Sequence, residues 1–547
     1  MNRSITIEGI PFNIDVLVKQ MKCDLKDDWF PDTLIYGDAL RADKILGHFM
    51  KHNKKPQLKY FPAKSEQYNI PKKGFTLRYS LETTIHDRLL YHGAANYLIR
   101  FYDKLLSPSV FSHRWTKKPK NKYMFLNAPS QWTKFEDAAK TKLRKKTDVL
   151  LVSDIQNFYE NIRISDIQKA LIDELPNLCL GKTQVRRIQK TVEIISRLLR
   201  AWTPYKKHGI PQNRDASSFL ANVLMHRVDK AMVSKGYKYV RYADDMRIVC
   251  DSKYSARKIL KEVIIELRKI GLNVNAQKTL ILHQNTKEIE NYIRKPNRKV
   301  EQIDQLFKSH RRSTVQQSFP LLKAYALELI RAKKTQAREF RFCIHRLEKI
   351  ALCKEAKRGF DFKKITRSVI RQLSEQPCSS DSFIRYLKSV DLTPKNLKEL
   401  VKIMLDREKN IYSWQSYLLW QLFVAHKYSN TKLINLAKQI VKGTKSVPLL
   451  SGALLYLGAC GSAEDRVYLA KRFKKLKHYI TQRNGMIAIH ELPYAPHIRD
   501  KVQPFVRADI RGTYRALQDA SLRGNYFIPL EPINITELYR DLPEYDN

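Results

Sequence analysis

Residues 241–250 are Arg-Tyr-Ala-Asp-Asp-Met-Arg-Ile-Val-Cys, and the adjacent acids Asp244 and Asp245 constrain this chain more than any other feature. The flanking segments, residues 237–242 and 246–250, are rich in β-branched and aromatic residues, which predicts a hairpin with both acids at its turn. Neighbouring carboxylates repel each other, and each is costly to remove from water without a partner. A divalent cation bound at the turn would neutralise both charges.

A third acid, Asp154, ends another predicted strand over residues 148–153. An acid at this position could also be a helix N-cap, but the acidic pair downstream favours a shared metal site. Carboxylates that hold metal ions beside a nucleoside triphosphate are the chemistry of polymerases. The sequence therefore predicts a catalytic group of Asp154, Asp244 and Asp245.

The charge balance indicates a polyanionic partner. Lys and Arg total 101 against 54 Asp and Glu, which gives a formal net charge of +47. Solubility needs far less charge, and such an excess destabilises a compact chain unless a polyanion neutralises it. Nucleic acid is therefore the expected partner, with salt-dependent affinity.

Two further features of the composition bear on location. No apolar run approaches the length of a membrane-spanning helix, so no membrane association is expected. The chain has seven cysteines. They are scattered without metal-type spacing, which favours a reducing, intracellular compartment.

The chain is too long for one core, and its pattern changes near residue 300. Residues 1–300 mix strand-like and helix-like segments. Residues 301–547 contain amphipathic helices joined by short loops, for example a helix that starts at Pro394 with Thr393 as its cap. This second half is predicted to be an α-solenoid or an irregular bundle, without a clear repeat period.

Three segments around the acidic turn carry recognisable motifs in a fixed order. They are Asp-Ile-Gln-Asn-Phe-Tyr-Glu-Asn-Ile (154–162), Gly-Ile-Pro-Gln-Asn-Arg-Asp-Ala-Ser-Ser-Phe-Leu-Ala-Asn (209–222) and Gly-Leu-Asn-Val-Asn-Ala-Gln-Lys-Thr (271–279). They resemble motifs A, B and D of reverse transcriptases. Asn213 stands where that family mostly has Gly, but Asn tolerates a positive φ better than other residues, so the turn can survive.

Upstream segments resemble the fingers of the same family. Residues 75–78, Phe-Thr-Leu-Arg, offer Arg78 as the basic strand residue that grips the triphosphate. Asp87 and Arg88 are instead expected to form a structural pair. The resemblance implies an α+β right-hand palm and fingers over residues 1–300, followed by an all-α, HEAT-like helical-repeat domain over 301–547 that replaces the thumb.

The resemblance also implies roles for the motif residues. Asp154, Asp244 and Asp245 would hold two Mg²⁺ ions, for which Mn²⁺ is an alternative, and the carbonyl of Ile155 would add a ligand. Lys278 would stabilise charge or act as a general acid beside the leaving pyrophosphate, although a plain surface lysine is the alternative. Gln212 belongs to the loop that approaches the incoming nucleotide and the template base.

Tyr159 bears on the choice of sugar. In reverse transcriptases an aromatic residue at this position excludes a 2′-hydroxyl, because burying an unpartnered hydroxyl costs about 1–3 kcal/mol. Tyr159 therefore predicts dNTPs as substrates, with a core aromatic as its alternative role.

The combination of palm, fingers and helical half resembles the bacterial abortive-infection and defence-associated reverse transcriptases, of the AbiK type. That resemblance implies antiphage DNA synthesis in the bacterial cytoplasm, either primed by a protein tyrosine without a template or templated by a noncoding RNA. It also implies a homo-oligomer, a trimer or a hexamer. The alternatives are an RNA-directed RNA polymerase and a nucleic-acid scaffold with a vestigial palm.

Overall fold

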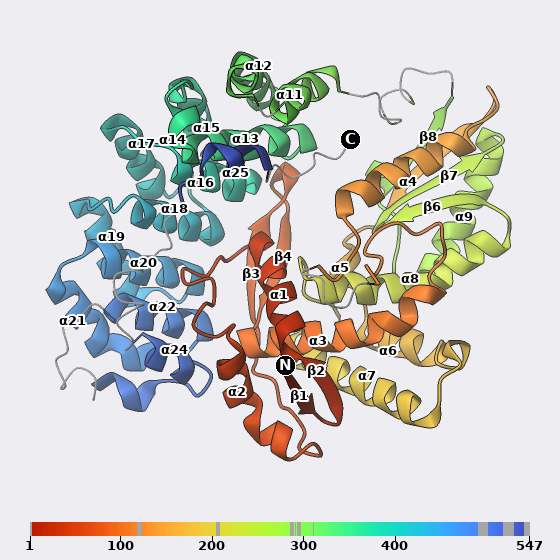
Figure 1. Cartoon of the computed structure of the whole chain (residues 1–547), viewed down its shortest axis with the longest axis horizontal. Helices are drawn as coiled ribbons and strands as arrows, with labels where there is room; N and C mark the ends of the chain where they lie inside the picture. The colour runs from red at the N-terminus through yellow and green to blue at the C-terminus, as the bar shows by residue number, and fades with distance from the viewer. Residues whose placement is uncertain are drawn as a thin grey trace.

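The computed structural model describes residues 3–117, 123–203, 208–284, 289, 292, 297–309, 311–490, 501–517 and 530–540. In Figure 1 a four-stranded sheet and its helices lie on the right, and a hairpin of long strands stands in the centre. An arc of helices from the C-terminal half curves around the left. The mixed first half and the helical second half confirm the predicted fold class, while the boundary at residue 300 stays a prediction. None of the described helices is both long enough and apolar enough to cross a membrane.

The four-stranded sheet forms the palm. Its strand order is β6-β7-β5-β8, and each neighbouring pair is antiparallel. Three of these strands match the predicted ones to within one residue at either end, whereas the short strand β8 was not predicted. The strands are β5 (Val149–Asp154), β6 (Lys238–Tyr242), β7 (Asp245–Cys250) and β8 (Leu280–His283).

The two faces of the palm sheet differ because side chains alternate along a strand. Leu151, Met246 and Ile248 are buried in the main core, on the face covered by helices α8 and α9. The side chains of Asp154 and Asp245 alternate with these core residues. They therefore lie on the opposite face, at the end of the sheet. The covering helices are α8 (Asp215–Ser234) and α9 (Lys253–Lys269).

The fingers are built from a two-stranded antiparallel sheet of β3 (Glu66–Pro71) and β4 (Leu77–Glu82), followed by α3 (Ile85–Tyr102). Thr84 caps α3 by accepting a hydrogen bond from the Asp87 N–H. The other elements before residue 203 are β1 (Ser4–Ile7), β2 (Ile10–Asn13), α1 (Ile14–Asp24), α2 (Ala42–Lys54), α4 (Ala128–Lys142), α5 (Phe158–Asn161), α6 (Ile164–Asp173) and α7 (Lys182–Trp202).

The C-terminal helices stack in two rows. One row, α13-α16-α18-α20-α22, is linked by contacts between successive members, and α12-α15-α17-α19 forms the second. Helix α18 is buried on all sides, as a helix without a polar face must be. The predicted cap at Thr393 is confirmed.

The bounds of these helices are α11 (Arg298–Lys308), α12 (Arg312–Arg331), α13 (Arg338–Leu352), α14 (Lys354–Lys357), α15 (Lys363–Glu375), α16 (Ser380–Ser389), α17 (Pro394–Leu405), α18 (Ser413–Ala425), α19 (Thr431–Gly443), α20 (Val447–Cys460), α21 (Ala463–Arg472), α22 (Tyr479–Ile489), α24 (Arg511–Ala516) and α25 (Ile535–Arg540).

The segment between α1 and α2 joins the helical half to the fingers. The Trp414 indole donates to the carbonyl of Trp29 over 2.7 Å. Arg483 of α22 forms buried ion pairs with Asp32 and Asp38. These contacts fix the helical half against the N-terminal part of the chain.

Candidate active site

The three acids predicted to bind metal come together at one end of the palm sheet. Asp154 and Asp245 are directly opposite each other in the antiparallel register, and Asp244 lies in the two-residue turn between β6 and β7. Opposite residues in antiparallel strands have Cβ atoms about 4.5–5.5 Å apart. Asp154 is buried, and both turn acids are half-buried.

The turn that carries these acids is strained and firmly held. Ala243 has a φ of 53°, and this left-handed conformation costs a residue with a Cβ about 1–2 kcal/mol. Its N–H donates to the Ser112 hydroxyl over 2.7 Å, and Arg241 donates to its carbonyl over 2.8 Å. Arg241 is in turn ion-paired with Asp229 of α8 in the core. These contacts with the core side of the sheet therefore fix the position of the acids.

Burial and mutual repulsion raise the proton affinity of the turn acids. Burial, followed by the charges of Asp245 and Asp154, raises the pKa of Asp244 to about 7. Burial and the charge of Asp154 also raise the pKa of Asp245. A cation at this position would remove most of that penalty.

Lys278 is the nearest cation to Asp154. Its ammonium donates to the Asp154 carboxylate over 2.8 Å, while its side chain remains 62% exposed. Burial lowers the pKa of Lys278, but the bond to Asp154 and the charges of the turn acids outweigh it and raise that pKa. The structure thus brings Lys278 together with the predicted metal ligand Asp154, while its predicted role beside the leaving pyrophosphate stays a prediction.

The backbone at Ile155 points toward the same site. Ile155 forms an antiparallel bridge with Val274. The hydrogen bonds between the two segments are made by the residues before and after Ile155, and not by Ile155 itself. In such a pair the N–H and C=O groups of the central residues point away from the partner segment. The Ile155 carbonyl therefore faces the β7 side, where the acids lie.

Tyr159 lies between α8 and the acidic turn. Its hydroxyl is 3.2 Å from the Ser218 hydroxyl, and its carbonyl accepts from the Ile210 N–H. Burial raises the pKa of Tyr159 to about 12, with a smaller contribution from the charge of Asp244. The ring is thus fixed within electrostatic reach of the acids.

The loop before α8 has the backbone conformation that its residues suggest. Asn213 has a φ of 57°, which supports the expectation that Asn can replace Gly at this position. Gly209 has a φ of 85°, and an added Cβ would lie 1.7 Å from the Tyr79 hydroxyl. Gln212 donates to Glu160 over 3.0 Å, which ties this loop to the helix that carries Tyr159.

The sequence did not single out Lys72, which follows β3 in the fingers. Its ammonium lies 3.3 Å from the Asn157 side-chain oxygen and 3.8 Å from Glu160. Burial lowers the pKa of Lys72. The charge of Lys278 also lowers this pKa, whereas the charge of Asp154 raises it. The signal that could have revealed it is the Lys-Lys-Gly sequence at the hairpin turn.

Arg78 is not brought together with the acids. Its guanidinium carbon lies 5.6 Å from the centroid of the Trp29 ring, and its Nε is buried without a hydrogen-bond partner among the described residues. Burial lowers the pKa of Arg78, and the charge of Asp381 on α16 partly counteracts this. Arg78 therefore lies between the fingers and the helical half.

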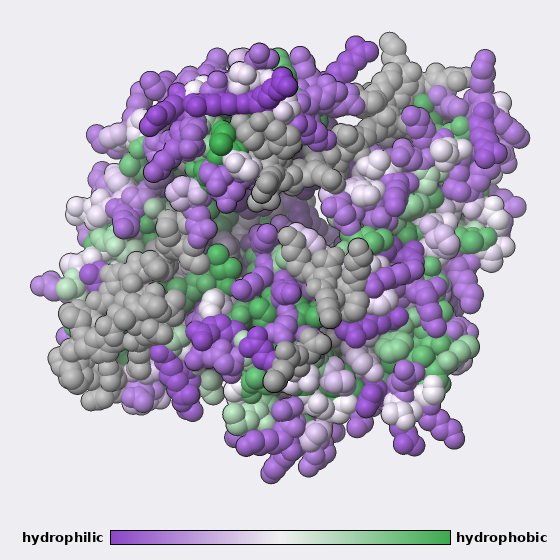
Figure 2. Space-filling model, viewed as in Figure 1, coloured by the Kyte–Doolittle hydropathy of each residue, from purple (hydrophilic) through white to green (hydrophobic). Residues whose placement is uncertain are grey.

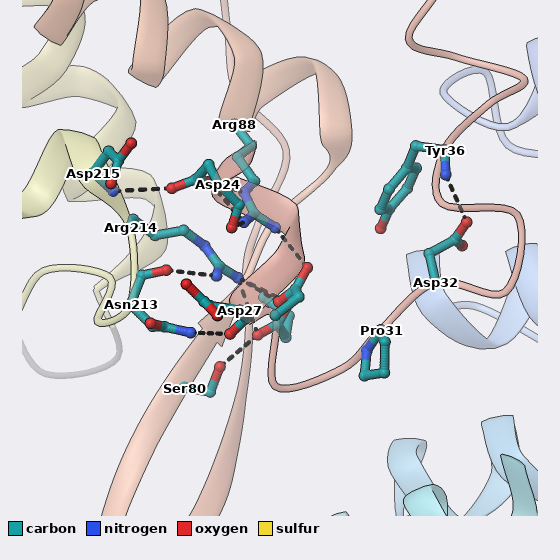
Figure 3. A network of polar contacts seen from close by, with 12 residues as sticks. Asp24, Asp27, Pro31, Asp32, Tyr36, Ser80, Arg88, Asn213, Arg214 and Asp215 are labelled. Carbon is teal, nitrogen blue, oxygen red and sulfur yellow. Dashed lines mark hydrogen bonds and ion pairs between the residues drawn. The ribbon is translucent and has the colours of Figure 1, made fainter. Parts of the chain in front are cut away.

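A second group of acids lies behind the loop before α8, and we call it the buried arginine network (Figure 3). Arg88 pairs with Asp24 and Asp28 at 2.7 Å, while Arg214 pairs with Asp28 and Glu82. Asp87 and Arg88 were expected to pair with each other. Each residue makes a structural contact, but not with the other. The Asp87 carboxylate accepts a hydrogen bond from the Tyr60 hydroxyl.

The buried arginine network also contains ligand-type side chains. Atoms of Asp24, His92 and Asp215 lie within 4.8 Å of one another. Asp24 already accepts from Arg88 and from the backbone N–H of Asp215, and His92 contacts Gln20. These contacts account for the cluster as part of the fold.

The palm acids suit a divalent cation better than the buried arginine network does. Their oxygens are the ligands that hard divalent ions prefer. Burial and mutual repulsion raise the pKa of Asp244 and Asp245 despite the nearby charge of Lys278. The residues present therefore fit a divalent metal site.

Comparison with known proteins places the chain in a family. Residues 70–343, half of the chain, match the model of the family described as reverse transcriptase (RNA-dependent DNA polymerase). No curated protein matches the chain.

Solved structures of telomerase are among those to which the chain is similar. Telomerase from Candida albicans, in complex with a fragment of telomeric RNA, is 12% identical with a TM-score of 0.30 and covers 74% of this chain and 68% of its own. Apo telomerase from Candida tropicalis is 15% identical with a TM-score of 0.31 and covers 75% and 73%. On the family match over residues 70–343, the chain belongs to the reverse transcriptase family of RNA-dependent DNA polymerases.

Proposed function

We propose that this chain joins dNTPs into DNA by nucleotidyl transfer at Asp154, Asp244 and Asp245. The observation that carries the proposal is the meeting of these three acids at the end of β5 and β7, with the pKa of Asp244 raised to about 7. Acids that the fold leaves without a fixed cation are best explained as ligands for metal ions.

The three carboxylates and the carbonyl of Ile155 would hold two Mg²⁺ ions, with Mn²⁺ as the alternative. When bound, these ions lower the pKa of the attacking hydroxyl and neutralise the leaving pyrophosphate. Lys278 is expected to move from Asp154 toward the pyrophosphate once the acids are neutralised. Its exposed side chain allows that movement, and its ammonium can donate a proton or stabilise charge.

Other residues would select and hold the nucleotide. Tyr159 is expected to pack under the sugar, because its ring is fixed near Asp244 by the contact with Ser218. Lys72 and Arg78 of the fingers would bind the triphosphate, with Lys72 nearer to the acids. Gln212 would position the loop beside the incoming base through Glu160.

The direct test compares the wild type with Asp244→Asn plus Asp245→Asn in a primer-extension assay. The double variant keeps the shape of both side chains and is expected to lose dNTP incorporation by about a thousandfold or more, with an unchanged circular-dichroism spectrum. Asp251→Asn, which alters an exposed acid after β7, serves as the control and should retain activity. Incorporation by the double variant would contradict the proposal.

The same assay separates the alternatives. An RNA-directed RNA polymerase would prefer NTPs, which would refute the role of Tyr159. A scaffold with a vestigial palm would bind nucleic acid without incorporating either substrate. Tyr159→Val should allow NTP incorporation to rise about tenfold or more relative to dNTPs if the ring excludes the 2′-hydroxyl.

We also propose a role in bacterial antiphage defence, in the cytoplasm, as a homo-oligomeric enzyme with HEAT-like helical repeats. The motif resemblance and the two rows of C-terminal helices support this. Purifying the protein from its host and sequencing the associated nucleic acid tests it. Covalently attached DNA would indicate protein priming, and a discrete RNA would indicate a noncoding template.

A further inference from the structure

A cavity of about 490 Å³ lies between α2 and α24, which are neighbours at the lower left of Figure 1. Its walls come from α2, the start of α3, the start of α22 and the segment around α24. Figure 2 shows the surface hollowed between the helical half and the palm, whereas all residues lining this cavity come from outside the palm sheet. The volume falls within the range of small-molecule sites, about 300–1,000 Å³.

Two glycines leave space in this cavity, one on each side. A Cβ added at Gly47 of α2 or at Gly512 of α24 would meet no atom within 4 Å. Gly47 lies in the interior of α2, where glycine is destabilising relative to alanine. Because no close neighbour requires a glycine at this position, its effect is the open space that it leaves in the cavity.

The charge on the cavity wall is positive once the internal ion pairs are counted. The acids that line the cavity each pair with an arginine, and these pairs are Asp38 with Arg483, Asp43 with Arg41, and Asp509 with Arg507. Arg511 and Arg515 also line the cavity and form no ion pair among the described residues. They are four residues apart on α24, so they lie on the same side of the helix. Two guanidinium groups on one side suit the oxygens of a phosphate.

Two histidines form a flat, neutral part of the wall. The rings of His48 and His86 are stacked, with centroids 3.5 Å apart and planes 8° apart. Burial lowers the pKa of His48 to about 4 and that of His86 to about 3, so both rings are neutral near pH 7. The His48 side chain is exposed, and an aromatic ring of this kind can stack on any nucleobase.

His86 also has an unused hydrogen-bonding atom. The residue is 9% exposed, and its Nδ1 is buried without a hydrogen-bond partner among the described residues. A buried polar atom without a partner is costly. A ligand group or an ordered water in the cavity would relieve that cost.

We propose that this cavity binds a nucleoside monophosphate. Arg511 and Arg515 would hold the phosphate, and the base would stack on the ring of His48. Helix α3 begins at the cavity wall with Ile85 and His86, and the positive end of its dipole also favours an anion. Since residues of both halves line the cavity, the bound nucleotide would link the helical half to the fingers. This inference goes beyond the proposed polymerase function and does not depend on it.

The test is isothermal titration calorimetry of the full chain with AMP, in the presence of EDTA to keep divalent metal ions out of the palm. The wild type should bind one AMP per chain. Gly47→Phe places a ring in the open space and should weaken binding at least tenfold. Gly443→Phe is the matched control, because Gly443 ends α19 with equally open space around it and lies outside the cavity. This control should bind AMP as the wild type does.

A second pair of variants tests the phosphate contact. Arg511→Gln plus Arg515→Gln should weaken AMP binding about tenfold or more, because both charged donors are lost. Arg367→Gln plus Arg371→Gln is the control, since these are two exposed arginines four residues apart on α15. Adenosine should bind the wild type at least tenfold more weakly than AMP. CMP should bind within about tenfold of AMP, because stacking tolerates either base.

Several outcomes would overturn the proposal. They are the absence of AMP binding by the wild type, an equal loss in either control, and inorganic phosphate binding as tightly as AMP. Thermal melting shows whether each variant keeps its fold, and the arginine variants carry the test if Gly47→Phe melts early.

The palm variant separates this site from the proposed active site. Asp244→Asn plus Asp245→Asn should bind AMP with wild-type affinity, because the palm acids lie outside the cavity. Loss of AMP binding in this variant would place the nucleotide at the palm and overturn the proposal. Binding of AMP is measured without catalysis, so a failure of the polymerase proposal would leave this result unchanged.

Discussion

Two clusters of acids, the buried arginine network beside the loop before α8 and the acids at the palm turn, differ in how their charge is balanced. In the buried arginine network, Asp24 pairs with the buried Arg88 (Figure 3), and Asp28 pairs with the buried Arg214. Burial raises the pKa of both acids, but Arg88 and Arg214 outweigh it and hold that pKa below its ordinary value. At the palm turn the balance is reversed, and the pKa of Asp244 rises to about 7.

The difference separates a structural cluster from a functional one. Asp24 and Asp28 are neutralised by arginines inside the fold, so they contribute to its geometry and need nothing from solution. Acids at the palm turn are held in place by Ser112 and Arg241 through the backbone of Ala243. The lysine bonded to Asp154 beside them is exposed, and the charges of Arg247 and Lys278 do not offset the rise in the pKa of Asp245. A site of this second kind is completed by a ligand.

The largest effect is expected from a substitution that disrupts the buried arginine network. Arg88→Met leaves Asp24 and Asp28 buried without the partner they share and should lower the free energy of unfolding by about 3–5 kcal/mol. Urea denaturation measures it. Arg100→Met, on the exposed side of the same helix, should change stability by less than about 1 kcal/mol. A stable Arg88→Met protein would mean that the two clusters do not differ as described.

A smaller effect is expected from removing the cation at the palm. Lys278→Met should reduce the rate of dNTP incorporation by about a hundredfold, because a positioned proton donor contributes at least that much. Stability should change little, since the Lys278 side chain is exposed. Lys269→Met, which removes an exposed lysine paired within α9, should leave the rate unchanged. Single-turnover incorporation measures both variants, and equal rates would remove Lys278 from the chemistry.

The smallest effect is a pH dependence of stability in the presence of a chelator. The raised pKa of Asp244 favours the folded state at low pH, and this contribution is lost as pH rises from about 4 through about 7. Asp244→Asn lacks the titration, so its melting temperature relative to the wild type should increase between pH 5.5 and pH 8. A constant difference across that range would show that Asp244 is not held at a raised pKa.

The palm site was predictable because its signals are local. A strand, a turn and the acids at their junction are encoded within a few residues, and the same holds for Asn213 and the loop before α8. Lys72 was missed because its position depends on a contact with a distant segment, that of Glu160. The partners of Arg88 lie 60 residues or more away in sequence, for the same reason.

The most direct measurement is thermal melting at pH 8 of the wild type and of Asp244→Asn plus Asp245→Asn, each with and without Mg²⁺. If the palm acids bind a divalent cation, Mg²⁺ should raise the melting temperature of the wild type but not that of the variant. The metal-free variant should also melt above the metal-free wild type, because two repelling charges are gone. A Mg²⁺ shift that persists in the variant, or a variant less stable than the metal-free wild type, would contradict the assignment of these acids as the metal site.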